Sequence, residues 1–210
     1  MNTIAEVRAD LRRDLADLDS TAYRWTDTDL NRHITHALND LSDAIPRALR
    51  TTLATVAGTR DIDIATLSPR IKVDRVEYPV ADYPPQFIQF SVWGTTLTLL
   101  TDNAPTAVEP VNIYWEAQHQ LDEAGTTLDP PLLDILLLGA AAYAADQLVS
   151  ANTEAIWGAD VDKAYAALAT RKMRAFRSAL KLKGANASVR ISRLYTPAEP
   201  GPTQTTDPGP

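Results

Sequence analysis

The sequence feature that most constrains the fold is an apolar helix past the middle of the chain, in segment 126–150, TTLDPPLLDILLLGAAAYAADQLVS. Asp129 can cap this helix, and Pro130 and Pro131 suit its first turn, where a missing N–H costs nothing. Apolar residues then recur at helical spacing and give a broad apolar face. The uncharged run 135–145 has 11 residues, whereas a membrane span needs about 20. The pattern therefore predicts a buried helix.

The middle of this helix has almost no side-chain volume, so another backbone can approach it closely. We expect helices on both sides, one of them the fourth helix of the same chain and the other from the same chain or from a neighbouring subunit. An ordinary core helix in a monomer explains the pattern equally well. The predicted subunit-packing residues are Gly139, Ala140, Ala141, Ala142 and Tyr143.

The composition is that of a globular chain whose length allows one domain or a small domain with an insertion. Its 210 residues are 45% hydrophobic, which is enough for a core, and none is cysteine, so nothing indicates disulfides or a thiolate metal site. The first residues, MNTIAEVRADLRRD, lack the apolar region of a signal peptide. We expect a soluble protein that is cytoplasmic where it is made, with no membrane partner.

Charge is distributed unevenly along the chain. The formal net charge is −7, yet residues 171–193 contain eight basic residues and no acidic one. Residues 1–170 carry the other 12 basic residues against 25 acidic ones, a net charge of −13. An acidic body with a basic C-terminal segment predicts that the two ends meet different partners.

Helical periodicity occurs on both sides of a different, central pattern. Residues 4–18 predict a short amphipathic helix, and a second helix begins at the cap Thr26 and ends at Ile45, before Pro46. A long fourth helix is predicted from about Asp160 to Leu182, with Gly184 as its C-cap. The segment 188–195, SVRISRLY, is β-prone.

Between these helices, apolar residues alternate with polar ones in the manner of strands. About six strands in roughly 70 residues predict a compact antiparallel sheet or a small sandwich. Gly58-Thr59 and Gly94-Thr95 are predicted hairpin turns. The alternating apolar positions are Ile62 and Ile64, Ile71 and Val73, Ile88, Phe90 and Val92, Leu97 and Leu99, and Val111, Ile113 and Trp115.

The order of elements predicts an α+β fold: a four-helix bundle with an inserted small antiparallel β-domain and an extended C-terminal arm. The bundle takes residues 1–48 and 128–184, and the β-domain takes residues 49–127. Residues 185–195 form a docking arm. Residues 196–210 hold five prolines among small polar residues, which predicts a disordered tail.

No residue pattern points to catalysis. His33 and His36 are three apart on the second helix, but a metal site needs further ligands and there is no HExxH. The chain has no phosphate-binding loop, no GxGxxG and no GxSxG, and no carboxylate pair stands out among 27 acids. Arg171, Arg174 and Arg177 could bind phosphate, although a solvated face or an acidic protein partner accounts for them as well. We therefore expect no enzyme, no catalytic residue, no metal and no cofactor.

Three stretches have a pattern and an order that occur together in a known family. They are YRWTDTDLNRHITHALNDLSDAIP at residues 23–46, VDRVEYPVADYPPQFIQF at residues 73–90, and LDPPLLDILLLGAAAYAADQL at residues 128–148. Together they resemble the head–tail connector, or portal adaptor, proteins of tailed bacteriophages. They cover under half of the chain and match in pattern and order rather than in a diagnostic motif.

The resemblance implies a structural virion protein in the neck, present in the host cytoplasm during assembly. Such proteins form a ring, usually of twelve copies, between the portal protein and the next tail or tail-completion protein. Double-stranded DNA passes through the channel without sequence-specific binding, and an acidic body would let it slide. The C-terminal segment would reach the portal, through the predicted portal-binding residues Val189, Arg190, Ile191, Arg193, Leu194 and Tyr195.

Two other classes of function fit parts of the sequence. One is a β-sandwich binding module, for example for carbohydrate, that uses Trp93, Tyr114 and Trp115 and stands on a helical stalk. The other is a hydrolase that uses acidic residues of the β-domain. A mass measurement in solution separates them from a ring-forming protein, which should give a large species or assemble when mixed with its portal.

Overall fold

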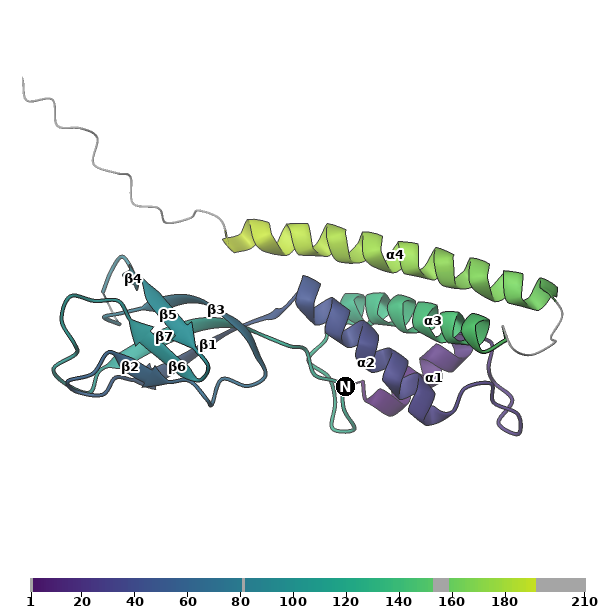
Figure 1. Cartoon of the computed structure of the whole chain (residues 1–210), viewed down its shortest axis with the longest axis horizontal. Helices are drawn as coiled ribbons and strands as arrows, with labels where there is room; N and C mark the ends of the chain where they lie inside the picture. Colours follow the sequence, from purple (N-terminus) through teal and green to yellow (C-terminus); the bar gives the residue numbers. More distant parts are fainter. Residues whose placement is uncertain (1, 81, 153–158, 192–210) are drawn as a thin grey trace, which may run out of the picture.

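The computed structural model describes residues 2–80, 82–152 and 159–191, and within this range it shows four helices and seven strands. Figure 1 shows an elongated molecule with the helices at one end, here called the helical unit, and the strands at the other, here called the β unit. In chain order the elements are α1 (Ile4–Asp14), α2 (Asp27–Ala44), β1 (Arg47–Ala54), β2 (Asp61–Asp63), β3 (Arg70–Glu77), β4 (Phe87–Ile88), β5 (Phe90–Trp93), β6 (Thr96–Leu99), β7 (Pro110–Ala117), α3 (Pro130–Asn152) and α4 (Ala159–Ile191).

The predicted start of α2 is confirmed. The Thr26 side chain accepts a hydrogen bond from the backbone N–H of Asp29, and the Asp29 carboxylate accepts one from the backbone N–H of Thr26. Such reciprocal bonds satisfy two backbone donors that a helix start otherwise leaves free. The predicted end of the first helix is wrong, since α1 stops at Asp14 and Ala16 has a positive φ of 53°.

Helix α3 is the centre of the helical unit and packs against α1, α2 and α4. By length and composition its segment Pro130–Ser150 could cross a membrane, and half of that segment is buried inside the chain. Its apolar residues share one hydrophobic core with Leu11 of α1, Ile34 of α2 and Phe176 of α4. Burial of α3 in this core accounts for its apolar composition.

The α+β class is confirmed. A regular four-helix bundle is not shown, because α1 has 11 residues, α4 has 33, and α4 packs mainly on one helix, α3.

The β unit consists of two small antiparallel sheets that enclose a second core. One sheet has the order β1-β7-β3-β4 and the other the order β2-β6-β5. Residues of both sheets, such as Ile113 and Leu97, are fully buried in the shared core. The predicted turn at Gly94 joins β5 and β6, with φ of 58° at the glycine. Gly58 also has a positive φ, but it forms no hairpin because β1 pairs with β7 and β2 with β6.

Helix α4 is longer than the sequence predicts. It continues through Gly184 to Ile191, so Gly184 is not a C-cap, and residues 188–191 are helical rather than extended. The glycine has another role: a Cβ placed on it would lie 3.0 Å from the carbonyl oxygen of Ala44 at the end of α2. A helix that has formed gains one hydrogen bond for each residue it adds, which outweighs the weak helix propensity of valine and isoleucine.

His119, just after β7, connects the two units. Its Nε2–H donates to the carbonyl oxygen of Ile45 at 3.1 Å, and its backbone N–H donates to Oγ of Ser42 at 3.0 Å. With Nε2 as the donor of a neutral ring, Nδ1 accepts from the Thr127 hydroxyl at 3.2 Å. Burial lowers the pKa of His119, so the ring is neutral at pH 7.

Candidate interaction surface on helices α3 and α4

Helix α4 is held on α3 by an aromatic ring that lies against a glycine. The Phe176 side chain is 1% exposed. A Cβ on Gly139 would lie 2.8 Å from Cζ of Phe176 and 3.0 Å from Cβ of Ala37 in α2, so this position has no room for a side chain. The close approach of the fourth helix, expected from the small residues of α3, is therefore present.

The predicted subunit-packing residues differ in how far they can reach another molecule. Ala140, Ala141 and Ala142 are at most 1% exposed within a single chain, and Gly139 is also buried. Tyr143, the last of the set, is half-buried and reaches the surface. A subunit contact by this set stays a prediction, and a partner on the folded chain would meet Tyr143.

Tyr143 is fixed from the side of α2. Its hydroxyl donates a hydrogen bond to the Asp40 carboxylate, and the His36 ring lies edge-on to it, with ring centroids 5.8 Å apart. Burial, and after it the hydrogen bond to Asp40, raise the pKa of Tyr143 to about 12. The phenol is therefore neutral at pH 7 and acts as a positioned hydrogen-bond donor.

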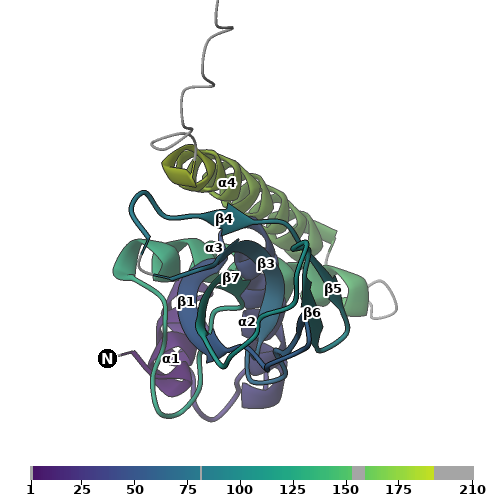
Figure 2. The ribbon, with the colours of Figure 1, turned by 90° about the vertical axis from the view of Figure 1, so that its left-hand side faces the viewer.

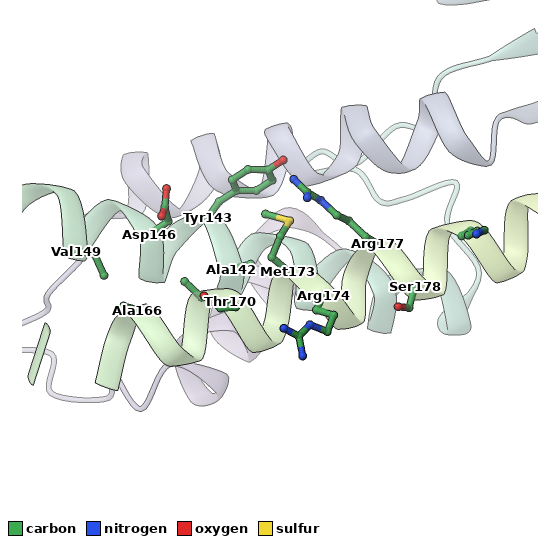
Figure 3. A pocket seen from close by; sticks show the side chains of 12 residues that line it. Ala142, Tyr143, Asp146, Val149, Ala166, Thr170, Met173, Arg174, Arg177 and Ser178 are labelled. Carbon is green, nitrogen blue, oxygen red and sulfur yellow. The ribbon is translucent and has the colours of Figure 1, made fainter. Parts of the chain in front are cut away.

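An open groove of about 770 Å³ lies between α3 and α4 beside Tyr143 (Figure 3). Its sides are formed by Val149 and Ala142 of α3 and by Met173 of α4, so its lining is mainly apolar. Figure 3 shows Arg177 reaching toward the hydroxyl end of Tyr143. The charged residues that line the groove are Asp146, Arg174, Arg177 and Lys181.

The described part of α4 from Lys163 onward carries basic side chains and no acidic one. Lys172 forms an ion pair with Asp14 of α1, with Nζ and Oδ2 3.0 Å apart. In the described ranges, Arg174, Arg177 and Lys181 form no ion pair, and all three are exposed. The groove therefore presents three positive charges that the described chain does not neutralise.

The predicted portal-binding residues divide into two groups. Val189, Arg190 and Ile191 form the end of α4, so the extended arm predicted for them is wrong. Arg193, Leu194 and Tyr195 lie outside the described residues, as does the predicted tail 196–210.

The two histidines of α2 lie in different surroundings. His33 is buried, with Nε2 2.6 Å from Oε1 of Gln147, while His36 is exposed. Among the described residues there is no group of three or more histidine or carboxylate side chains that could hold a metal. Nδ1 of His33 is buried without a partner, and burial lowers the pKa of this ring.

The aromatic residues of a possible carbohydrate site are not brought together. Trp93 is 89% exposed at the β5–β6 turn, whereas Trp115 is in the core of the β unit and its Nε1–H donates to Thr51 Oγ1 at 3.0 Å. Tyr114 precedes Trp115 on the same strand and therefore points to the opposite face of the sheet. The three rings do not form one binding platform.

Sequence reasoning missed Asp40 of α2, which holds the Tyr143 side chain beside the groove. The hydrogen bond of Tyr143 joins it to Asp40, 103 positions earlier in the chain. Nothing in the local pattern around Asp40 marks this pairing, because it depends on how α2 lies against α3. Met173 of α4 also lines the groove.

No protein-family model and no curated protein matches the chain. Among solved structures, it is similar to a chain of the neck of an empty GTA (gene transfer agent, phage-like) particle computed with C6 symmetry, with 17% identity over 65% of this chain and 76% of that chain and a TM-score of 0.31. It is also similar to a chain of the neck of the native GTA particle computed with C12 symmetry, with 17% identity, 65% and 74% coverage and a TM-score of 0.27. Likeness at this level does not by itself establish a common fold or function.

Proposed function

We propose that the chain is a structural protein of the neck of a tailed phage or phage-like particle, where it forms the adaptor ring between the portal and the tail. The observation that carries this proposal is the uncovered basic side of α4, next to the α2–α3 pair that carries two of the three connector-like stretches. Residues 23–46 include all of α2, and residues 128–148 include most of α3.

The character of the groove supports a protein contact rather than catalysis. Small-molecule sites are usually concave, enclose most of the ligand and place a few polar groups that converge on it. This groove is open, its lining is mainly apolar, and its arginines and lysine are on flexible side chains at the surface. Such a surface fits the apolar centre and charged rim of a protein interface.

The charge of the remaining chain supports a channel that does not retain DNA. Residues 76–162 contain 13 acidic residues and no lysine or arginine. A protein that holds DNA places basic side chains on the phosphates, whereas an acidic wall repels them. In the proposed ring, the exposed acidic residues of this part that lie outside the subunit contact, such as Asp82 and Asp102, are favoured to face the channel.

The experiment is to co-express the full chain with the portal protein encoded in the same genome, isolate the portal and image it by electron microscopy. The expected result is a ring of this chain on the tail-facing side of the portal. A portal that carries none of the chain, together with assembled particles whose neck lacks it, would overturn the proposed function.

A further inference from the structure

We propose that the α3–α4 groove binds a second copy of this chain, through an acidic edge formed by Glu6, Asp122 and Glu123. The inference rests on the proposed ring function, for which it names the surfaces that join one copy to the next. The groove with Arg174, Arg177 and Lys181 is called the basic groove below.

The basic groove has the features of an unfilled contact site. It lies over well-anchored structure, because Phe176 and Gly139 fix α4 on α3 and Asp40 fixes Tyr143. Its lining is mainly apolar, and three basic side chains on it have no ion pair within the described residues. DNA would pair with the basic groups and leave the apolar lining without a partner, whereas a protein surface can cover both.

The acidic edge is built by two segments that lie side by side. The backbone N–H of Ile4, at the start of α1, donates to the carbonyl oxygen of Asp122 at 3.0 Å. The turn 120–127 is closed by a bridge between Leu121 and Thr126, and Oδ1 of Asp122 accepts hydrogen bonds from the next backbone N–H groups. The three acidic side chains of the edge, Glu6, Asp122 and Glu123, are exposed and have no ion pair within the described ranges.

The two surfaces lie on opposite sides of the helical unit. Figures 1 and 2, at right angles to each other, both show α4 on one side and the N-terminal end of α1 on the other. Two different, complementary surfaces on opposite sides make a head-to-tail contact, which closes into a ring if the rotation between copies allows it. One acidic edge on one basic groove would leave both surfaces of every copy occupied.

The sequence itself separates the charges that such a contact needs. Residues 163–198 contain nine basic residues and no acidic one, directly after the segment 76–162 with its 13 acidic residues and no lysine or arginine. Asp146 also lines the groove, so the groove holds one acidic group beside its three basic ones. Complementary charges of this kind steer association and set the register of the partner.

The test uses the absence of cysteine from the chain. A full-length double variant, Ser178→Cys in the groove and Ala124→Cys beside the acidic edge, is treated with a short bis-maleimide. If the two surfaces meet, cross-linked species appear as a ladder of dimers, trimers and larger forms. A control variant with Ser178→Cys and Ser91→Cys, whose second thiol lies on β5 of the β unit, should give background dimers only.

Charge reversal then tests whether the basic residues of the groove and the acidic residues of the edge hold the copies together. R174E/R177E should weaken self-association about tenfold, the size expected from a small number of close charge pairs. Arg171→Glu is the matched control, because Arg171 is exposed on the same helix but does not line the groove. Adding Asp122→Lys and Glu123→Lys to R174E/R177E should restore the ladder.

A ladder no stronger than that of the control pair, or one that survives R174E/R177E, would overturn the inference. All of the reversed side chains are exposed, and thermal melting confirms that each variant is folded. Portal binding by the same variants separates the two proposals. If the portal still carries the chain while the ladder is absent, the interface is wrong and the function stands. If the ladder forms but the portal never carries the chain, the interface stands and the proposed function is wrong.

Discussion

The helical unit and the β unit enclose their cores in different ways. In the β unit two sheets cover the core from both sides, and fully buried residues such as Ile113 and Leu97 face each other between them. In the helical unit α3 is covered by α1, α2 and α4, but α4 itself is covered on one side only. The β unit therefore closes its core from both sides, whereas the helical unit leaves a long, basic side of α4 uncovered and suited to a partner.

The largest effect that we expect is the loss of portal binding when the C-terminal end of the chain is removed. Deletion of residues 185–210 should abolish portal binding and leave both cores folded, because both lie before residue 185. A second truncation, which ends at Ile191, tests whether the last residues of α4 are sufficient for portal binding. Pull-down with the portal measures binding, and circular dichroism measures folding. Normal portal binding by the chain that lacks residues 185–210 would contradict a C-terminal portal contact.

Phe176→Ala tests whether α4 belongs to the core of the helical unit. Phe176 is 1% exposed and packs against Gly139, so the free energy of unfolding should fall by about 3–5 kcal/mol. Leu182→Ala removes an apolar side chain from the same helix where it is 65% exposed, and it should change the stability by less than about 0.5 kcal/mol. Urea titration measures both, and equal effects would show that α4 is not packed as described.

Gly139→Leu tests the contact from the side of α3. Since Phe176 and Ala37 leave no room for a Cβ there, overpacking should lower the free energy of unfolding of the monomer by about 1–3 kcal/mol. Ala175→Leu adds a similar side chain at an exposed position of α4 and should leave the stability nearly unchanged. A Gly139→Leu chain that melts normally but fails to assemble would place the contact between subunits instead.

Acid should destabilise the folded chain through two buried histidines. Burial lowers the pKa of His33 and of His119, so below about pH 6.5 the unfolded chain binds protons that the folded chain does not. Stability is therefore highest above this pH and falls as the pH decreases from about 7 to 5, by at most about 1.4 kcal/mol per pH unit for each histidine. Urea midpoints across this range measure the slope. The double variant His33→Gln/His119→Gln should flatten this pH dependence. An unchanged slope would show that the two histidines do not cause it.

Apart from the control substitutions, Gly94→Ala is expected to have the smallest effect, and it concerns the β unit alone. Nothing lies within 4 Å of an added Cβ, so the only cost is the positive φ of 58°, worth roughly 1–2 kcal/mol for a residue with a side chain. At Gly94 a side chain would meet backbone strain but no crowding, whereas at Gly139 it would meet crowding by Phe176 and Ala37. A loss of stability larger than that of Gly139→Leu would reverse the comparison between the two units.

Local chemistry made parts of the fold predictable. Thr26 and Asp29 mark the start of α2 through their side chains alone, and the alternation around Leu97 and Ile113 reports strands because one face is buried. The sequence prediction missed β1, although Leu49 and Leu53 alternate with polar residues there, since both are only half-buried.

The remaining features depend on contacts between distant segments. Gly184 has the composition of a C-cap, and only the position of Ala44 shows that it allows a close approach inside a continuing helix. Of the residues at the groove, the sequence analysis named Ala142 and Tyr143 as subunit-packing residues and Arg174 and Arg177 as possible contacts of phosphate or of an acidic protein partner, and these roles stay predictions. The groove could not be predicted, because it depends on how α4 packs on α3 and on the hydrogen bond of Tyr143 to Asp40, 103 positions earlier.

The most direct test of the central claim is the structure of the chain assembled on its portal, determined by electron cryomicroscopy. The account predicts that the α4 surface from Arg174 to Lys181 lies between neighbouring copies, with an acidic or neutral wall facing the channel. A ring in which this basic surface lines the channel would contradict the account.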